Sequence, residues 1–192
     1  MFKSKGFISA VVGFGVVILF FVMPLMGKYN NLVESQSNVD VQWAKVESKL
    51  QRRYDLIPNL VNSVQGVMEQ EQEVFGAIAD ARSKIGKATT TDESIDANEQ
   101  MDSAVMSLIM LTENYPELKS NENVQSLMTE LAGTENRISV ERDRYNEEVQ
   151  GYNNTVKKFP GSLVANMFGF DEYKYYEADA QASVAPTVNF ND

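Results

Sequence analysis

The chain of 192 residues carries a net charge of −10 at pH 7 and contains neither cysteine nor histidine. The missing residue types exclude disulfides, cysteine nucleophiles, Ser-His-Asp triads, histidine bases and the usual zinc sites. Because the charge is acidic and no basic patch is interleaved with aromatic residues, we predict no nucleic-acid partner, and we expect no cofactor, metal or catalytic residue.

The first predicted element is a transmembrane helix. Residues 1–5 form a short basic N-terminus, and residues 6–27 form an uncharged, strongly apolar run between Lys5 and Lys28. A helix needs about 20 such residues to cross roughly 30 Å of hydrocarbon, so the run predicts a single span with the lipid bilayer as its partner. A cleaved signal peptide is the alternative, but the run is long and ends without a small-residue cleavage signal. The lysines before the run favour a cytoplasmic N-terminus and place the following domain outside the cytoplasm.

Apolar residues then repeat every seven positions. Two series share this spacing: Leu32, Val39, Val46, Arg53, Leu60, Val67, Val74 and Ala81, and Gln36, Trp43, Leu50, Ile57 and Val64. Such a stripe is typical of helices that pack in a bundle or coiled coil, and it predicts one long helix from about Tyr29 to Lys84. Pro58 interrupts the stripe and predicts a bend near Tyr54–Pro58, and a break capped by Asp55 is the alternative.

The remaining helices predict an antiparallel arrangement. Turns are expected near residues 86–92 and 114–120, with a shorter amphipathic helix between them and a third helix from about Asn121 to Phe159. We therefore predict an all-α fold in which residues 28–170 form an elongated antiparallel three- to four-helix bundle. A group of apolar residues at 163–170 predicts either a plug for the end of the bundle or a short helix.

Residues 171–192 form a C-terminal tail. Val188 and Phe190 alternate with polar residues after Pro186, as in a short extended peptide that docks on a protein surface. A frayed tail is the alternative.

Two adjacent arginines are candidate contacts for a partner. Arg52 and Arg53 lie near Pro58, and their guanidinium groups fit a carboxylate or an acidic partner surface. The structural alternative pairs Arg53 with a glutamate of the third helix, while Asn59 binds carbonyl groups that Pro58 frees.

Tyr145 and Tyr152 are also candidate partner contacts, because they lie seven residues apart on one helix face. The alternative is that both are half-buried, with hydroxyls that reach water or Arg52 and Arg53. The many carboxylates of the same helix permit a hydrolase interpretation. However, charges of alternating sign at helical spacing are typical of a solvated face.

An ordered set of motifs runs along nearly the whole chain. It comprises 29–33, Trp43, 51–61, Gly66, 81–82, 115–119, 131–138, 144–146, 152–153, 159–160, 168–170 and 186–190. Together with the apolar N-terminal run, this set resembles the LemA family of bacterial membrane-anchored proteins. Many members carry a histidine where this chain has Gln70 and an aromatic residue where it has Val124. The first departure argues against a shared histidine-dependent role.

The resemblance implies a single-pass protein of the bacterial inner membrane with an elongated antiparallel helical bundle and no established enzymatic activity. It also favours a functional peptide at 186–190. We expect a non-enzymatic protein that self-associates and scaffolds or supports the cell envelope. The alternative is an adaptor for a membrane protease or a TPM-domain protein, since genes of the family often lie near genes for such proteins.

Overall fold

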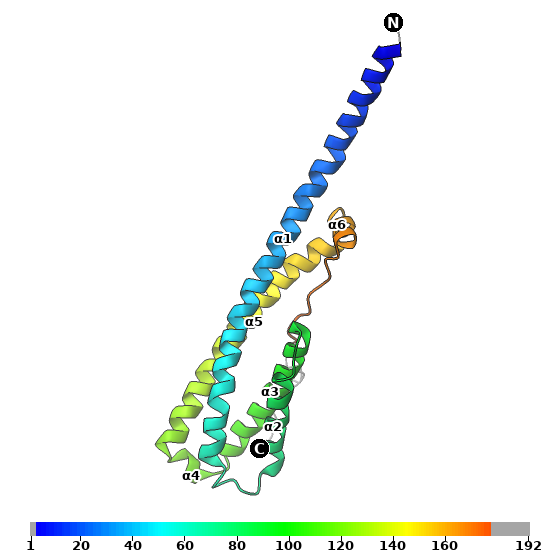
Figure 1. Ribbon diagram of the computed structural model, residues 1–192. Helices are drawn as coiled ribbons and strands as arrows, with labels where there is room; N and C mark the ends of the chain where they lie inside the picture. The colour runs from blue at the N-terminus through cyan, green and yellow to red at the C-terminus, as the bar shows by residue number, and fades with distance from the viewer. Residues whose placement is uncertain (1–2, 178–192) are drawn as a thin grey trace, which may run out of the picture. The chain divides into compact units, whose positions relative to one another are not determined.

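The computed structural model describes residues 3–177, and within α1 it leaves out the side chains of residues 3–12, 14 and 16–22. The described chain is helical and contains no strand, so the all-α prediction is confirmed (Figure 1). Its helices are α1 (Lys3–Val64), α2 (Gln72–Ile85), α3 (Thr91–Thr112), α4 (Pro116–Lys119), α5 (Glu122–Lys157) and α6 (Gly161–Phe168).

The chain divides into two compact units. The first unit combines residues 1–44 with 144–174, and the second combines residues 45–143 with 175–192. Helices α1 and α5 therefore contribute one part to each unit.

The backbone of the predicted membrane span is helical and belongs to α1. Within the described part of the chain, no helix is both long and apolar enough to cross a membrane. Of the predicted span, the side chains of residues 6–12, 14 and 16–22 lie outside the described ones. The structure therefore gives the span no support, and it stays a prediction.

Helix α1 continues through Pro58, so the alternative of a break capped by Asp55 is wrong. Proline has no N–H to bind the carbonyl oxygen four residues earlier, which belongs to Tyr54. Arg82 of α2 supplies that bond from Nη1 at 2.7 Å, and its guanidinium stacks 3.9 Å from the centre of the Tyr54 ring. Asn59, which was expected to have this role, donates instead to the carbonyl oxygen of Asp55 at 3.2 Å.

The prediction that α1 reaches Lys84 is wrong, because the helix ends at Val64. The amides of Val67 and Met68 both donate to the Val64 carbonyl oxygen at 3.0 Å, which closes a turn before α2 begins. Met68 is fully buried within that turn. The seven-residue spacing continues across the turn, so the spacing alone does not reveal where the helix stops.

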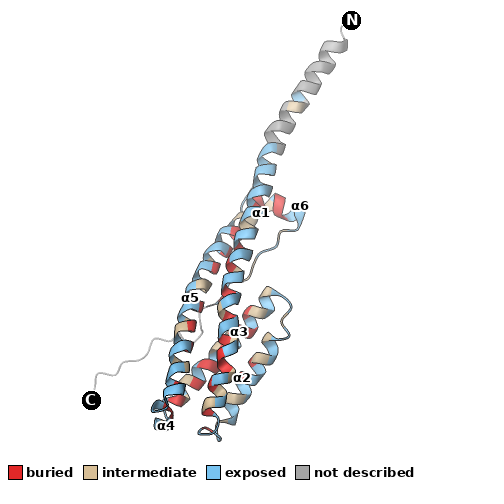
Figure 2. Cartoon of the chain, turned by 60° about the vertical axis from the view of Figure 1, so that its left-hand side comes forward, coloured by how far each residue is buried: buried red, intermediate tan, exposed pale blue. Residues whose placement is uncertain are grey.

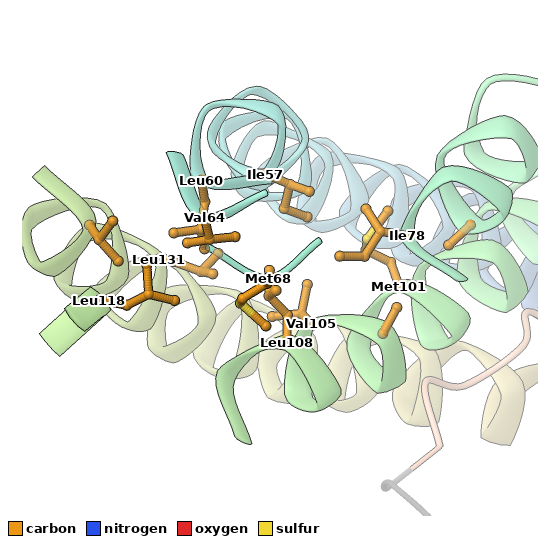
Figure 3. Packing of buried hydrophobic residues seen from close by; sticks show 13 residues of the cluster. Ile57, Leu60, Val64, Met68, Ile78, Met101, Val105, Leu108, Leu118 and Leu131 are labelled. Atoms are coloured by element: carbon orange, nitrogen blue, oxygen red, sulfur yellow. The ribbon is translucent and has the colours of Figure 1, made fainter. Parts of the chain in front are cut away.

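The core of the second unit is apolar and collects side chains from five helices and the turn after α1. Figure 3 shows the side chains of this core converging. Its fully buried or nearly buried members include Ile57, Leu60, Val64, Met68, Ile78, Met101, Val105, Leu108, Leu118 and Leu131. Burial of large aliphatic side chains stabilises such a core by about 1.5–3 kcal/mol each.

The core of the first unit is smaller and contains more aromatic residues. Leu32 and Val39 of α1 are fully buried, as are Tyr145, Val149 and Tyr152 of α5. Figure 2 colours the buried residues of α1 and α5 red. The apolar stripe of α1 is thus covered within the protomer along this part. Leu32 and Val39 are therefore not available to a second copy.

Candidate functional site

A buried cluster of charged side chains lies in the second unit. The side chain of Arg53 is only 1% exposed, and it forms an ion pair with Asp102 of α3. It also donates to Asn98 Oδ1 at 2.8 Å and to Glu135 Oε2 at 3.3 Å. An unpaired buried charge is strongly destabilising. The partners on α3 and α5 therefore allow an arginine at an apolar position of α1. The predicted pairing of Arg53 with a glutamate of the third long helix is confirmed.

A second arginine completes this cluster. Arg142 of α5 donates from Nη1 to Asp102 Oδ2 at 2.7 Å and from Nη2 to Asp102 Oδ1 at 3.1 Å. Its guanidinium also lies 4.4 Å from the centre of the Tyr176 ring. We call Arg53, Asp102, Glu135 and Arg142 the ionic cluster. It contains two positive and two negative groups, and it links α1, α3 and α5.

The two carboxylates of the ionic cluster have opposite pKa shifts. Burial alone would raise the pKa of Asp102, but the hydrogen bond from Arg142 and the charge of Arg53 outweigh it and lower that pKa. For Glu135, burial dominates over the charge of Arg53 and raises the pKa. Burial also raises the pKa of the Tyr176 hydroxyl to about 12. The lowered pKa of Asp102 favours its charged form between the two arginines, which suits a structural ion pair.

Two observations on the described residues bear on metal binding and catalysis. Over residues 3–177, no group of three or more acidic side chains is placed to hold a metal ion. A depression of about 310 Å³ in the second unit is lined mainly by neutral side chains, with Glu113 and Lys119 as its charged residues. Such a lining contains no paired acid and base.

In the first unit, the segment after α6 is held along α5 by an asparagine. Asn153 Nδ2 donates to the Tyr173 carbonyl oxygen at 2.8 Å, and the Tyr173 amide donates to Asn153 Oδ1 at 3.0 Å. The Tyr173 hydroxyl donates to Asp40 of α1 at 2.8 Å. Lys157 and Glu172 add an ion pair at 2.6 Å. Residues 171–174 are therefore docked on the first unit.

Two tyrosines of α5 strengthen this docking. Tyr145 donates from its hydroxyl to the Lys174 carbonyl oxygen at 3.2 Å, and its ring lies 5.5 Å from the Trp43 ring. The Tyr152 ring meets the Tyr173 ring edge-on at 5.2 Å. Burial raises the pKa of the Tyr152 hydroxyl to about 12. Both tyrosines therefore bind the chain's own segment 171–174.

The candidate contact residues lie in different surroundings. Arg52 has an exposed side chain (58%) that forms an ion pair with Glu130. Arg53, Tyr145 and Tyr152 are buried and hence not accessible to a partner in this conformation. The predicted docking peptide with Pro186, Val188 and Phe190 lies outside the described residues.

Sequence reasoning missed Asn153 and Tyr173 as the residues that hold the tail. A signal was present, because the Tyr-Asn pair recurs at 145–146 and 152–153, and aromatic residues recur at 173, 175 and 176 in a polar tail. Asn98 and Asp102 were also missed, because their partner Arg53 lies more than 40 residues away in the sequence.

One exposed side of α1 in the first unit is free of charge over about 27 Å, at 1.5 Å per residue. Its residues lie three or four positions apart and are all exposed: Met26, Asn30, Val33, Ser37, Val41 and Ala44. We call this the uncharged face of α1. Helical periodicity places it on the side opposite to the buried Leu32 and Val39. Val33 and Val41 are 43% and 56% exposed, although both are apolar.

The chain resembles known proteins over most of its length. The sequence model of the LemA family matches residues 42–190. Magnetosome protein MamQ 2 of Paramagnetospirillum magneticum is 23% identical over 201 residues, which cover 91% of this chain and 74% of that protein. Magnetosome protein MamQ of Magnetospirillum gryphiswaldense is 24% identical, and the matched region covers 81% of this chain and 67% of that protein. Protein LemA of Metamycoplasma hominis is 23% identical, and the matched region covers 84% of this chain and 77% of that protein.

Proposed function

The chain belongs to the LemA family, and we propose that it is a non-enzymatic, membrane-anchored protein that self-associates and scaffolds or supports the bacterial envelope. In this proposal residues 6–27 form the anchor and the helical units form the scaffold. The uncharged face of α1 is the contact between copies.

In this proposal the anchor continues into the packed part of the first unit without a loop. Helix α1 covers the apolar run 6–27 and continues to Val64, and Leu32 is already fully buried only five residues after the run ends. An anchor followed directly by packed structure holds copies of the protein in a similar orientation at the membrane. Such a common orientation favours lateral contact between equivalent helices.

The uncharged face of α1 is the observation that carries self-association. Nearly a quarter of the chain is charged, yet this exposed strip of α1 carries no charge. A long strip of apolar and small polar residues at helical spacing is typical of surfaces on which helices pack together. Two parallel copies would bury the exposed Val33 and Val41 at this contact.

Non-enzymatic function is supported by what the buried polar groups do. Asp102 and Glu135 pair with arginines, and Asn153 binds backbone groups of Tyr173. These groups hold elements of the chain together.

Light scattering tests self-association directly. The full chain in a mild detergent is expected to be larger than a monomer, and Val41→Glu should lower its mass because it places a charge on the uncharged face. Asn38→Glu is the matched control, since Asn38 is exposed on a different side of α1. A wild-type protein that is monomeric at every concentration would reject the proposal. A monomer that cross-links to one specific membrane protein would support the adaptor alternative.

The extracytoplasmic position of the helical units is part of the same proposal. Because the chain contains no cysteine, Ser83→Cys introduces a single thiol at an exposed position of α2. A membrane-impermeant maleimide should label this variant in intact cells or spheroplasts as well as in lysed cells. Labelling that requires lysis would place the units in the cytoplasm and reject this topology.

A further inference from the structure

Apolar side chains remain exposed around α6, although this helix of the first unit buries part of its surface. Leu163 and Met167 lie one turn apart, whereas Val164 and Ala165 on the other side of the helix are buried. The exposed apolar residues of this region are Phe159 (79%), Leu163 (50%), Met167 (72%) and Phe168 (59%). We call these four residues the α6 face.

The composition around the α6 face suits a neutral environment. No charged residue occurs from Phe159 to Phe170, while Lys157 and Lys158 precede this stretch and Asp171 and Glu172 follow it. Exposed apolar groups of this density mark a surface that meets protein or lipid.

Direct contacts fix the position of the α6 face relative to α1. The Phe168 ring meets the Tyr29 ring edge-on at 4.8 Å, and the Phe170 ring meets Tyr29 at 5.7 Å. Helix α6 lies beside α1 at this level in both views (Figures 1 and 2). Tyr29 follows the last residue of the apolar run, Gly27, by only two positions, or about 3 Å along the helix.

We infer that the α6 face is a second membrane contact, inserted into the headgroup region of the bilayer next to the anchor. This inference rests on the proposed function, because it places the end of the run 6–27 at the edge of the hydrocarbon. The headgroup region extends roughly 5–7 Å beyond the hydrocarbon on each side. A ring packed against Tyr29 lies within that depth.

The chemistry of the region favours lipid as the occupant. Aromatic side chains are enriched where hydrocarbon meets headgroups, and this region contributes Tyr29, Phe168 and Phe170. Helices that lie in the membrane surface bury an apolar side by about 5–10 Å while polar residues stay in water. Leu163 and Met167 provide such a side. Because the α6 face is uncharged, its insertion should need no anionic lipid.

Quenching of tryptophan fluorescence by brominated lipids tests this contact. In the full chain, Trp43→Phe removes the single native tryptophan. A tryptophan is then introduced by Phe168→Trp at the α6 face, by Phe14→Trp within the run, or by Asn38→Trp as the control. Asn38 is exposed on α1 and lies about 16 Å beyond Gly27, outside the headgroup region. Each variant is placed in phosphatidylcholine nanodiscs with bromine either near the headgroup or near the bilayer centre.

The expected result is strong quenching of the Phe168→Trp variant by lipid brominated near the headgroup. The Phe14→Trp variant should be quenched by lipid brominated near the bilayer centre, and the Asn38→Trp variant by neither. Adding Leu163→Ser and Met167→Ser to the Phe168→Trp variant should reduce its quenching and leave that of Phe14→Trp unchanged.

Two results would overturn the inference in distinguishable ways. If only Phe14→Trp is quenched, the anchor stands and the α6 face is covered by something other than lipid, such as a second copy. If neither Phe14→Trp nor Phe168→Trp is quenched, the anchor of the proposed function fails and the second contact fails with it.

Discussion

The two units bury their polar groups by different chemistry. The second unit encloses two arginines and two carboxylates, whose charges cancel within the ionic cluster. The first unit uses neutral groups in the corresponding role, chiefly Asn153 and the tyrosines of α5. The first unit also contains the apolar run, the uncharged face of α1 and the α6 face. Because charge is costly near hydrocarbon, neutral chemistry fits the unit that we propose to meet the membrane.

The largest effect is expected at Asp102, whose carboxylate serves both arginines of the ionic cluster. Asp102→Asn removes its charge and leaves Arg53 and Arg142 buried with less compensation. We expect a loss of about 3–5 kcal/mol in the free energy of unfolding, the range for breaking a buried ion pair. Urea denaturation followed by circular dichroism measures this loss.

Glu135→Gln is the matched control within the same cluster. The pKa of Glu135 is raised, so the folded protein disfavours its charged form. The neutral amide of Glu135→Gln should therefore lower the free energy of unfolding by less than about 1 kcal/mol at pH 7. A loss at Glu135 equal to that at Asp102 would contradict the different roles of the two carboxylates.

The pH dependence of Asp102 has a defined sign. A lowered pKa stabilises the folded protein above the unfolded value of 3.8, and this stabilisation is lost as pH falls through the folded pKa. For Glu135 the raised pKa costs stability at neutral pH, and the cost is relieved as pH falls through the folded pKa towards 4.5. Asp102→Asn should therefore remove part of the acid-induced loss of stability expected for the wild-type protein, as measured by urea denaturation at a series of pH values.

An intermediate effect is expected at Asn153 in the first unit. Asn153→Ala removes both hydrogen bonds to the Tyr173 backbone. We expect a loss of about 1–3 kcal/mol in the free energy of unfolding, because the Tyr173 backbone groups lose a buried partner. The loss is limited because the freed segment regains hydrogen bonds to water. Hydrogen exchange should become faster at the Tyr173 amide. Asn154→Ala is the control, since Asn154 is an exposed neighbour in the same helix. Unchanged exchange at Tyr173 would show that Asn153 does not hold the segment.

The sequence predicts the fold class well because the apolar spacing reports helical packing directly. Leu32, Val39 and Val46 are all buried, as that spacing requires. The end of α1 was missed because Val67 and Val74 keep the same spacing across the turn, with Val67 left 40% exposed. A seven-residue pattern identifies a packed side, but it does not show whether the backbone remains helical.

The polar sites were harder to predict because their partners are distant in the sequence. The guanidinium of Arg82 binds the Tyr54 carbonyl oxygen, 28 residues away, at the position where Pro58 removes a bond. Nothing local to either residue specifies that pairing. By contrast, Arg53 interrupts the apolar series, and the structural alternative that pairs it with a glutamate of the third long helix is confirmed by its ion pair with Glu135.

The smallest effect is expected at Arg52, which adjoins Arg53 in sequence and differs from it in burial. The side chains of Arg52 and Glu130 are 58% and 42% exposed, so water and salt screen their ion pair. A double-mutant cycle with Arg52→Ala and Glu130→Ala should give a coupling of about 0–1 kcal/mol that falls as salt is added. A larger, salt-independent coupling would mean that this pair is buried in the functional assembly. Charged groups of the second unit would then lie at a surface that contacts another chain.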